Sequence, residues 1–447
     1  MAQFFNATQQ PLPEEGVVAQ TLDLDVLSGV RTIVDKVNLE GVGRTKDVVL
    51  KRECQRIFQS ENFEELVHNV DYTIKEFQRM GLFKAVGALI DVGKDANNYE
   101  VSFFVKEPSR LFGSIQTTVS GSGDTGLNVA VETPNVFGAG QKFRIEQGFG
   151  TKTKSHFTLS YGHPIQLSPL KYVNTSIFRR NFLLDASGLF NVDHGVGLDV
   201  QTELGPLTRH RVGWEGSWRY LNSLNPRTPY EVRQYAGHTL KSAVVNEIVH
   251  DTRDHAMLPE EGVLARFSNE LAGLGGDVKH VKSEANFQVN LPIWRSIVAQ
   301  ASLGCGYIFP LGLGPVSIGD RYFLGGLNLR GFAQNHVGPH AGAFALGGSA
   351  YWNSGLHVYA PLPFGDPHQP LLRHIRLHTF FNMGNVASDA KDLPGLFHTF
   401  PASVGCGIVL ALGKLARLEI NFARVLRAKE TEVQTGNFAF GFGVTYS

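Results

Sequence analysis

Residues 284–291 read Glu-Ala-Asn-Phe-Gln-Val-Asn-Leu, and polar and apolar side chains alternate along the whole stretch. In an extended strand, successive side chains point to opposite faces, so this stretch predicts a strand with one polar and one apolar face. The apolar face carries Ala285, Phe287, Val289 and Leu291, and the polar face carries Glu284, Asn286, Gln288 and Asn290.

The same alternation returns at 211–220 and at 417–422, and we count about sixteen such segments from residue 114 onward. The apolar faces of these two examples are Val212, Trp214, Trp218 and Tyr220, and Leu418, Ile420 and Phe422. A soluble β-sandwich also alternates, but its strands are usually shorter than about ten residues. Long runs with aromatic apolar faces are typical of strands that face lipid.

We therefore expect residues 111–447 to form a transmembrane β-barrel of about sixteen antiparallel strands. A spanning strand needs about 9 to 11 residues, which leaves room for turns and some long loops. Closure is compulsory in hydrocarbon, because each unpaired backbone group costs several kcal/mol there, and an even strand number permits antiparallel closure.

The composition agrees with this expectation. The 49 Gly, 31 Phe and 12 Tyr suit bent strands and aromatic interfaces, and we find no apolar run of the roughly 18 to 20 residues that a spanning helix needs. Lys+Arg and Asp+Glu both number 41, so net charge gives no case for a nucleic-acid partner.

The first 110 residues have a different character. Residues 1–28 lack periodicity, so we interpret them as a flexible leader. Residues 29–110 predict a small domain in the order β-α-α-β-β, with strands at 35–39, 85–91 and 99–107. Thr45 is the expected N-cap of the first helix, and Asn62 of a second helix that ends at Gly81.

One loop between two strand segments carries a motif. Residues 321–340 contain Gly325, Gly326, Arg330, Gly331 and Phe332 in the order Gly-Gly-Leu-Asn-Leu-Arg-Gly-Phe, after about eleven strands and before about five. This resembles the loop that folds back into the barrel in the BamA superfamily of barrel assembly and two-partner-secretion proteins. The glycines permit tight turns, and the guanidinium offers five donors to the inner wall. An ordinary surface loop with a solvated arginine is the alternative.

The resemblance implies that acidic residues on the two strands after the loop hold the arginine. At the matching positions this sequence has His357 and Asn382, which are both expected on polar strand faces. Neutral hydrogen bonds from Arg330 to these two candidate anchors are one option. Another inward acid, Glu419 or Glu270, is the other option.

The N-terminal domain resembles a polypeptide-transport-associated (POTRA) domain, in a single copy. Met1 to Gly16 show no secretory signal, and the first basic residue is Arg31. With the segments 349–352 and 361–364, these features resemble the core barrel of the mitochondrial sorting and assembly machinery (SAM). The resemblance implies an integral protein of the mitochondrial outer membrane, with the POTRA domain in the intermembrane space. Implied partners are β-barrel precursors, metaxin-type subunits, membrane lipid and the cristae-organising complex.

The last strand, expected at 438–446, fits the core of a barrel-targeting signal, although any barrel can end in an aromatic strand. Its outer face would carry Phe438, Phe440, Phe442, Val444 and Tyr446, and its inner face would carry Ala439, Gly441, Gly443 and Thr445. We expect this strand and the first, 114–121, to form a weak lateral seam. An incoming precursor strand could add there by β-augmentation.

We expect no enzyme and no cofactor. The sequence has no GxSxG, HExxH or GxxxxGK[ST] motif, and its three cysteines form no CxxC pair for a metal. His374 and His378 are expected to line the lumen rather than to bind metal. The resemblance implies that the protein assembles and inserts β-barrel precursors into the mitochondrial outer membrane, with a role in cristae organisation through its partners. A passive solute or polypeptide channel is the strongest alternative, and a membrane-bound hydrolase comes third.

Overall fold

The computed structural model describes residues 31–93, 97–119, 125–150, 154–165, 171–223, 226–255, 258–294, 296–312, 314–362, 374–389, 393–412, 416–435 and 438–443. The expected leader, residues 1–28, lies outside these residues. The chain divides into two compact units, residues 1–107 and 108–447.

The first unit has the predicted order of elements. These are β1 (Ile33–Glu40), α2 (Asp47–Cys54), the short 3-10 helix η1 (Ile57–Gln59), α3 (Phe63–Arg79), β2 (Ala85–Val92) and β3 (Asn98–Lys106). β3 lies in the centre of the sheet, parallel to β1 and antiparallel to β2. Phe77 of α3 is fully buried and contacts the rings of Phe83 and Phe103 edge to face, so the helix packs on the sheet.

Two helix signals in this unit had different outcomes. The side chain of Asn62 accepts a hydrogen bond from the backbone N–H of Glu65 at 2.7 Å, which confirms the predicted N-cap of α3. The cap assigned to Thr45 was wrong, because α2 begins at Asp47 after Lys46. The Thr45 hydroxyl and backbone N–H donate to Glu107 instead, at 2.8 and 2.9 Å.

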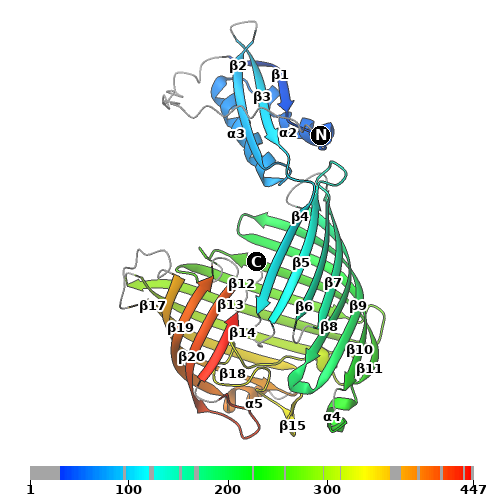
Figure 1. Cartoon of the computed structure of the whole chain (residues 1–447), viewed down its shortest axis with the longest axis vertical. Coiled ribbons are helices and arrows are strands. Elements are labelled where there is room, and N and C mark those ends of the chain that lie inside the picture. Colours follow the sequence, from blue (N-terminus) through cyan, green and yellow to red (C-terminus); the bar gives the residue numbers. More distant parts are fainter. Residues whose placement is uncertain are drawn as a thin grey trace, which may run out of the picture. The chain divides into compact units, whose positions relative to one another are not determined.

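The second unit is built around one sheet of sixteen strands in which every neighbouring pair is antiparallel (Figure 1). Among the described residues the sheet has sixteen strands, which is the expected number. They are β4 (Phe112–Val119), β5 (Thr125–Pro134), β6 (Lys142–Gly150), β7 (Ser155–Pro164), β8 (Lys171–Leu184), β9 (Leu189–Gly205), β10 (Thr208–Ser223), β11 (Gly237–Asp251), β12 (Gly262–Ala272), β13 (His280–Trp294), β14 (Ile297–Pro310), β17 (Ala350–Pro361), β18 (Ile375–Ala387), β19 (Ala402–Leu412), β20 (Ala416–Arg427) and β21 (Phe438–Gly443).

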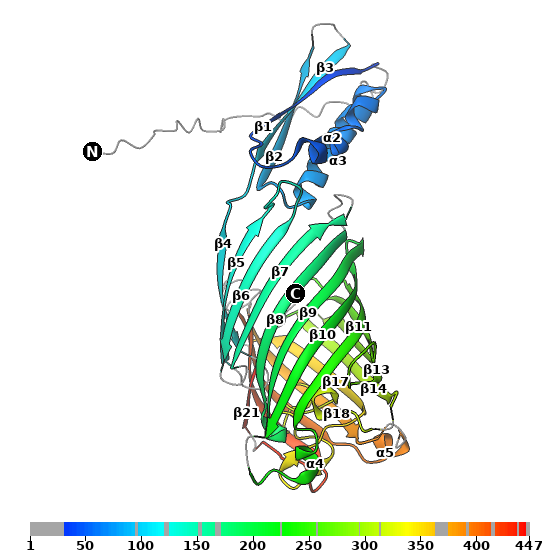
Figure 2. The ribbon, with the colours of Figure 1, turned by 90° about the vertical axis from the view of Figure 1, so that its right-hand side faces the viewer.

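The sheet is strongly curved, as the two views show (Figures 1 and 2). Arg376 of β18 forms an ion pair with Glu260 in the turn between β11 and β12, although three strands, β17, β14 and β13, lie between β18 and β12 in the sheet order. Leu258 of that turn is buried in one cluster with Val298, Tyr359, Val409 and Ala411. Distant strands therefore share one interior.

The two faces of the sheet are distributed as predicted, with apolar side chains exposed and polar side chains buried. On β20, Ile420 and Phe422 are 54% and 45% exposed, whereas Glu419 and Asn421 are 2% and 1% exposed. Trp214 and Trp218 of β10 are also exposed. We call the face that carries Glu419 and Asn421 the inner face. Since a water-soluble protein buries its apolar side chains, this inversion suits a sheet surrounded by lipid.

β4 and β21 stand at the two ends of the sheet order. Within the described residues, β4 pairs with β5 alone and β21 with β20 alone. The first strand begins at Phe112, two residues before the expected start. Residues 120–121 of the predicted first strand and 444–446 of the predicted last strand lie outside the described residues.

The second unit also holds two short helices, α4 (Tyr230–Arg233) and α5 (Leu393–His398). In the described part of the chain, we find no helix with the length and apolar character that a membrane crossing requires.

Candidate functional site

The motif lies in the segment between β14 and β17, after eleven strands of the sheet and before five, as predicted. This segment contains the 3-10 helix η4 (Ile318–Asp320) and the small hairpin of β15 (His340–Ala341) and β16 (Phe344–Ala345). Buried side chains of this segment pack against the strand residues Ile308, Tyr351 and Val386. The buried side chains of the segment are Val316, Tyr322, Leu324, Leu329, Phe332 and Val337. The alternative of a solvated surface loop was therefore wrong.

Glycines shape the motif. Gly325 and Gly331 have φ of 134° and 89°, which side chains with a Cβ rarely adopt. A Cβ on Gly325 would lie 2.2 Å from the carbonyl oxygen of Ala333. The backbone N–H of Gly326 donates to the carbonyl of Phe332 at 3.1 Å, which closes the turn that contains Arg330.

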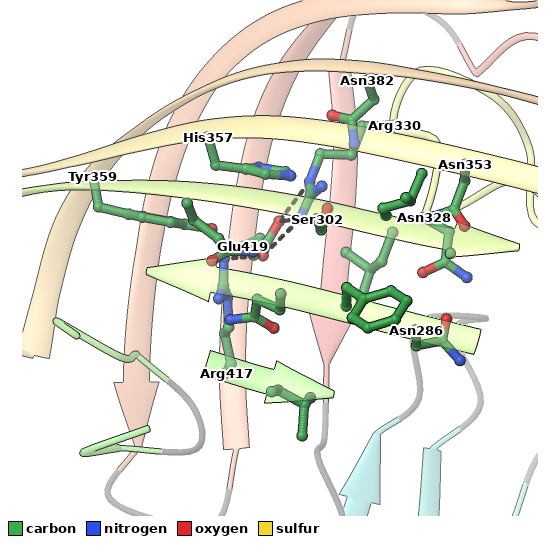
Figure 3. Close-up of a pocket in the computed structure, with 17 residues that line it drawn as sticks. Asn286, Ser302, Asn328, Arg330, Asn353, His357, Tyr359, Asn382, Arg417 and Glu419 are labelled. Carbon is green, nitrogen blue, oxygen red and sulfur yellow. Dashed lines mark hydrogen bonds and ion pairs between the residues drawn. The ribbon is translucent and has the colours of Figure 1, made fainter. Parts of the chain in front are cut away.

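Arg330 is held by Glu419 of β20 (Figure 3). Its Nε donates to Oε2 at 2.9 Å and its Nη2 to Oε1 at 3.0 Å, so the pair is bidentate. Both side chains are buried, at 8% and 2% exposure. The guanidinium also lies over the ring of Phe380, 5.3 Å from its centroid. Glu419 was one of the two acids predicted as an alternative partner, and the structure confirms it.

Glu419 has further partners on its own strand. Arg417 donates to Oε1 at 2.7 Å, and the side-chain amide of Asn421 donates to Oε2 at 2.8 Å. Arg417 also donates to the hydroxyl of Tyr359 at 2.7 Å. Residues two apart on a strand point to the same face, so the alternation of β20 brings Arg417, Glu419 and Asn421 together. The carboxylate is thus shared by two guanidinium groups.

The two predicted anchors, His357 and Asn382, do not hold Arg330 by hydrogen bonds in the described part of the structure. His357 Nδ1 lies 2.9 Å from Nε2 of His378, and the two rings stack. Asn382 is buried, and no hydrogen-bond partner of its Oδ1 is found among the described residues. The correction has a physical reason, because a carboxylate accepts both donors of a guanidinium and a neutral side chain does not.

These groups line one cavity of about 330 Å³ on the inner face (Figure 3). Arg330, Glu419, Arg417, His357, Tyr359 and Asn382 all border it. Asn286, Gln288, Gln300 and Asn353 add amide side chains to its wall. The predicted site residues of the loop and of β17 and β18 are therefore neighbours, although their bonds differ from those expected.

The last strand lies directly beside this site. In the ladder between β20 and β21, Gly441 is opposite Glu419, Ala439 is opposite Asn421 and Gly443 is opposite Arg417. Small residues of the predicted seam strand thus align with the residues that hold Arg330. Glycine has no side chain that could compete for this space.

Sequence reasoning missed a second anchor, Asp320, at the base of the loop. Its carboxylate accepts from Arg219 of β10 at 2.8 Å and from Lys241 of β11 at 3.0 Å. Its backbone carbonyl accepts from Lys282 of β13 at 3.0 Å. The available signal was an acid immediately before Arg321, in a loop that was predicted to meet a polar wall.

Glu270, the other acid predicted for Arg330, belongs to this second network. It lies 2.5 Å from Nζ of Lys241 and 2.8 Å from Nε2 of His280. Glu270, His280 and Asp320 are spaced closely enough to hold a cation. However, the Lys241 ammonium already contacts both carboxylates. We therefore interpret the cluster as a buried ion network.

Comparison with known proteins agrees with this geometry. The model of the Omp85 superfamily domain matches residues 135–446. The fold is similar to that of BamA from Haemophilus ducreyi, with a TM-score of 0.76 at 19% identity, covering 92% of this chain and 84% of that one. The sheet, the inward loop and the family match define a protein of the Omp85 superfamily.

Relatives narrow the assignment. The chain is 33% identical to a sorting and assembly machinery component 50 homolog of Xenopus tropicalis, over 94% of this chain and 92% of the relative. It is 29% identical to a SAM50-like protein of Drosophila melanogaster, over 94% and 96%. Within the superfamily, the chain belongs to the family of sorting and assembly machinery component 50 homologs.

Proposed function

We propose that this protein inserts β-barrel precursors into the mitochondrial outer membrane by strand exchange at a lateral seam between β4 and β21. The observation that carries the proposal is the position of these two strands at the ends of a sixteen-stranded sheet. Membership of the family of sorting and assembly machinery component 50 homologs supports both the role in barrel assembly and the location in the mitochondrial outer membrane.

The proposal includes closure of the sheet into a barrel. An apolar outer face suits strands that lie in hydrocarbon, where an open sheet edge would leave several costly unpaired backbone groups. Closure between β4 and β21 satisfies those groups. The proposed seam joins the first and the last strand of the sheet order, β4 and β21.

Insertion would then proceed by exchange of ladders. When the seam opens, β4 and β21 each present a row of N–H and C=O groups that a precursor strand can pair with. Each hydrogen bond lost from the seam is replaced by one to the precursor, so the exchange requires no cofactor and no enzymatic chemistry. The Arg330–Glu419 pair keeps the loop beside β21 during this exchange.

We assign the first unit as a single POTRA domain in the intermembrane space. The unit has two unpaired sheet edges, because β1 and β2 flank β3 in the described sheet. Either edge offers backbone groups to an extended precursor segment. Metaxin-type subunits and the cristae-organising complex are the partners that we propose by family resemblance.

A passive channel is the alternative. The packed loop disfavours it, because the buried cluster around Leu329 and Phe332 occupies the inner side of the sheet. A channel would be expected to leave its interior open to water. Depletion of the protein separates the two functions: loss of insertase leaves barrel precursors unassembled, whereas loss of a channel reduces flux across the membrane.

A disulfide scan tests the seam directly. Cysteine pairs between residues 112–119 and 438–443 should stop precursor insertion when oxidised and restore it when reduced. The matched control is Phe422→Cys with Phe438→Cys, which joins β20 to β21 at positions opposite each other without closing the seam. Insertion at the normal rate by a fully locked seam would refute strand exchange.

A further inference from the structure

The loop also contacts the chain just before the last strand through backbone hydrogen bonds. The N–H of Ala333 donates to the carbonyl of Val433 at 2.9 Å, and the N–H of Thr435 donates to the carbonyl of Gly331 at 3.0 Å. These two bonds flank an antiparallel bridge between Phe332 and Gln434. We call residues 331–333 and 433–435 the clasp.

The clasp joins two important positions. On the loop side it begins at Gly331, which follows the Arg330 that Glu419 holds. On the other side it ends at Thr435, three residues before Phe438, where β21 begins. Three extended residues span at most about 10 Å. The start of β21 therefore cannot move far while the clasp is closed.

Other described residues of the connector between β20 and β21 are held by hydrogen bonds as well. The backbone N–H of Lys429 donates to the Glu432 carboxylate at 2.8 Å, and Lys429 Nζ donates to the side chain of Asn385 on β18 at 2.8 Å. Phe332 is 1% exposed and packs in the loop cluster, which holds the loop side of the clasp in place. Both halves of the clasp are thus presented by ordered structure.

We propose that the clasp positions the first residues of β21 and so couples the Arg330 loop to the seam strand. This inference rests on the proposed function for its consequence, because it identifies the contact through which the loop acts on the seam. The positioning itself is a property of the fold and is measured independently. The groups responsible for this positioning are the backbone N–H groups of Ala333 and Thr435.

Proline substitution tests the clasp, because proline lacks the backbone N–H. Thr435→Pro removes one clasp bond and Ala333→Pro removes the other. Gln434→Pro is the matched control, since neither clasp bond uses the N–H of Gln434. Amide exchange of residues 438–443 is measured in the full-length protein in detergent, and precursor insertion is measured in lipid.

We expect amide exchange in the first half of β21 to rise by about fivefold in Thr435→Pro, the factor that one net hydrogen bond supplies. Ala333→Pro should raise it similarly, although it lies in the loop and about a hundred residues away in the sequence. Gln434→Pro should leave it within about twofold. A merely local role of the loop would not change β21 in Ala333→Pro.

The outcomes separate the two proposals. If exchange in Thr435→Pro and Ala333→Pro equals that in Gln434→Pro, the clasp does not position β21 and the inference is wrong, whatever the insertion rate. If exchange rises in both variants and insertion is unchanged, the clasp stands and the seam is not the site of insertion. Faster amide exchange in both variants together with altered precursor insertion supports both the clasp and the seam.

Discussion

Arg330 and Glu419 lie 89 residues apart in the chain and meet through two parallel hydrogen bonds on the inner face of the sheet. Removal of either partner should be costly, but not equally. Glu419→Gln leaves two buried guanidinium groups facing a neutral amide, so we expect a loss of about 3 to 5 kcal/mol. Arg330→Met should cost less, because Glu419 keeps Arg417 and Asn421. Thermal unfolding in detergent measures both.

Arg330→Lys separates charge from geometry in the same pair. Lysine keeps the positive charge but cannot donate two parallel bonds, so we expect stability between that of the wild type and Arg330→Met. Thermal midpoints equal to the wild type would show that charge alone suffices.

Asp320 supplies a second prediction. Asp320→Asn removes the charge that faces Arg219 and Lys241, leaving two buried cations with a neutral partner. We expect a loss of about 3 kcal/mol and faster proteolysis of the segment between β14 and β17. Glu430→Gln is the control, because Glu430 is an exposed acid in the same unit. Equal proteolysis of the two variants would contradict the anchor.

The inner wall near Glu419 depends on a glycine. A Cβ on Gly407 would lie 2.2 Å from the carbonyl oxygen of Ile420 and 2.3 Å from Oδ1 of Asn421. The side-chain amide of Asn421 in turn donates a hydrogen bond to Glu419. Gly407→Ala should therefore destabilise the sheet by about 1 to 3 kcal/mol. At Gly205, where the structure places nothing within 4 Å of a Cβ, Gly205→Ala should change the midpoint little. A similar effect of the two substitutions would argue against the contact.

The first unit carries a pH-dependent contribution at Glu107. Burial alone would raise the pKa of this carboxyl, but hydrogen bonds from Arg44 and Thr45 outweigh it and lower the pKa from 4.5 to about 2. Because the folded pKa is the lower one, the stabilisation is fully present above pH 4.5 and is lost as the pH falls through about 2.

Amide exchange of α3, corrected for intrinsic rates, measures this contribution. At neutral pH, Glu107→Gln should exchange faster than the wild type, and the difference should shrink below pH 4.5 and vanish below about 2. Glu40→Gln, at an exposed acid of the same unit, should match the wild type throughout. A difference at pH 2 as large as that at neutral pH would mean that the Glu107 charge is not its source.

The sequence was informative where the two-residue period of a strand decides which face each side chain occupies. Alternation placed Ile420 and Phe422 on one face and Glu419 and Asn421 on the other, and the burial agrees. The inward loop was predicted from the resemblance of its motif to the superfamily, and the positive φ of Gly325 and Gly331 explains why the motif requires glycine there.

The pairing inside the sheet was less predictable. The choice between His357, Asn382, Glu270 and Glu419 as partners of Arg330 depends on how far strands distant in sequence curve toward each other. The strand period assigns a face but no distance across the interior. The hydrogen bond from Lys241 to Asp320 and the clasp at Thr435 were not predicted for the same reason, because both join segments separated by many residues.

The inverted burial of the sheet has a consequence for how the protein is made. A chain that displays rings such as Trp218 and Phe422 outward and hides Glu419 cannot reach this form in water, where the exposed rings would aggregate before the ladder was complete. Each new molecule must arrive unfolded and mature at a bilayer. Under the proposed function it is then a client of older copies of itself, so a cell that lost every copy could not rebuild the machine from the gene alone.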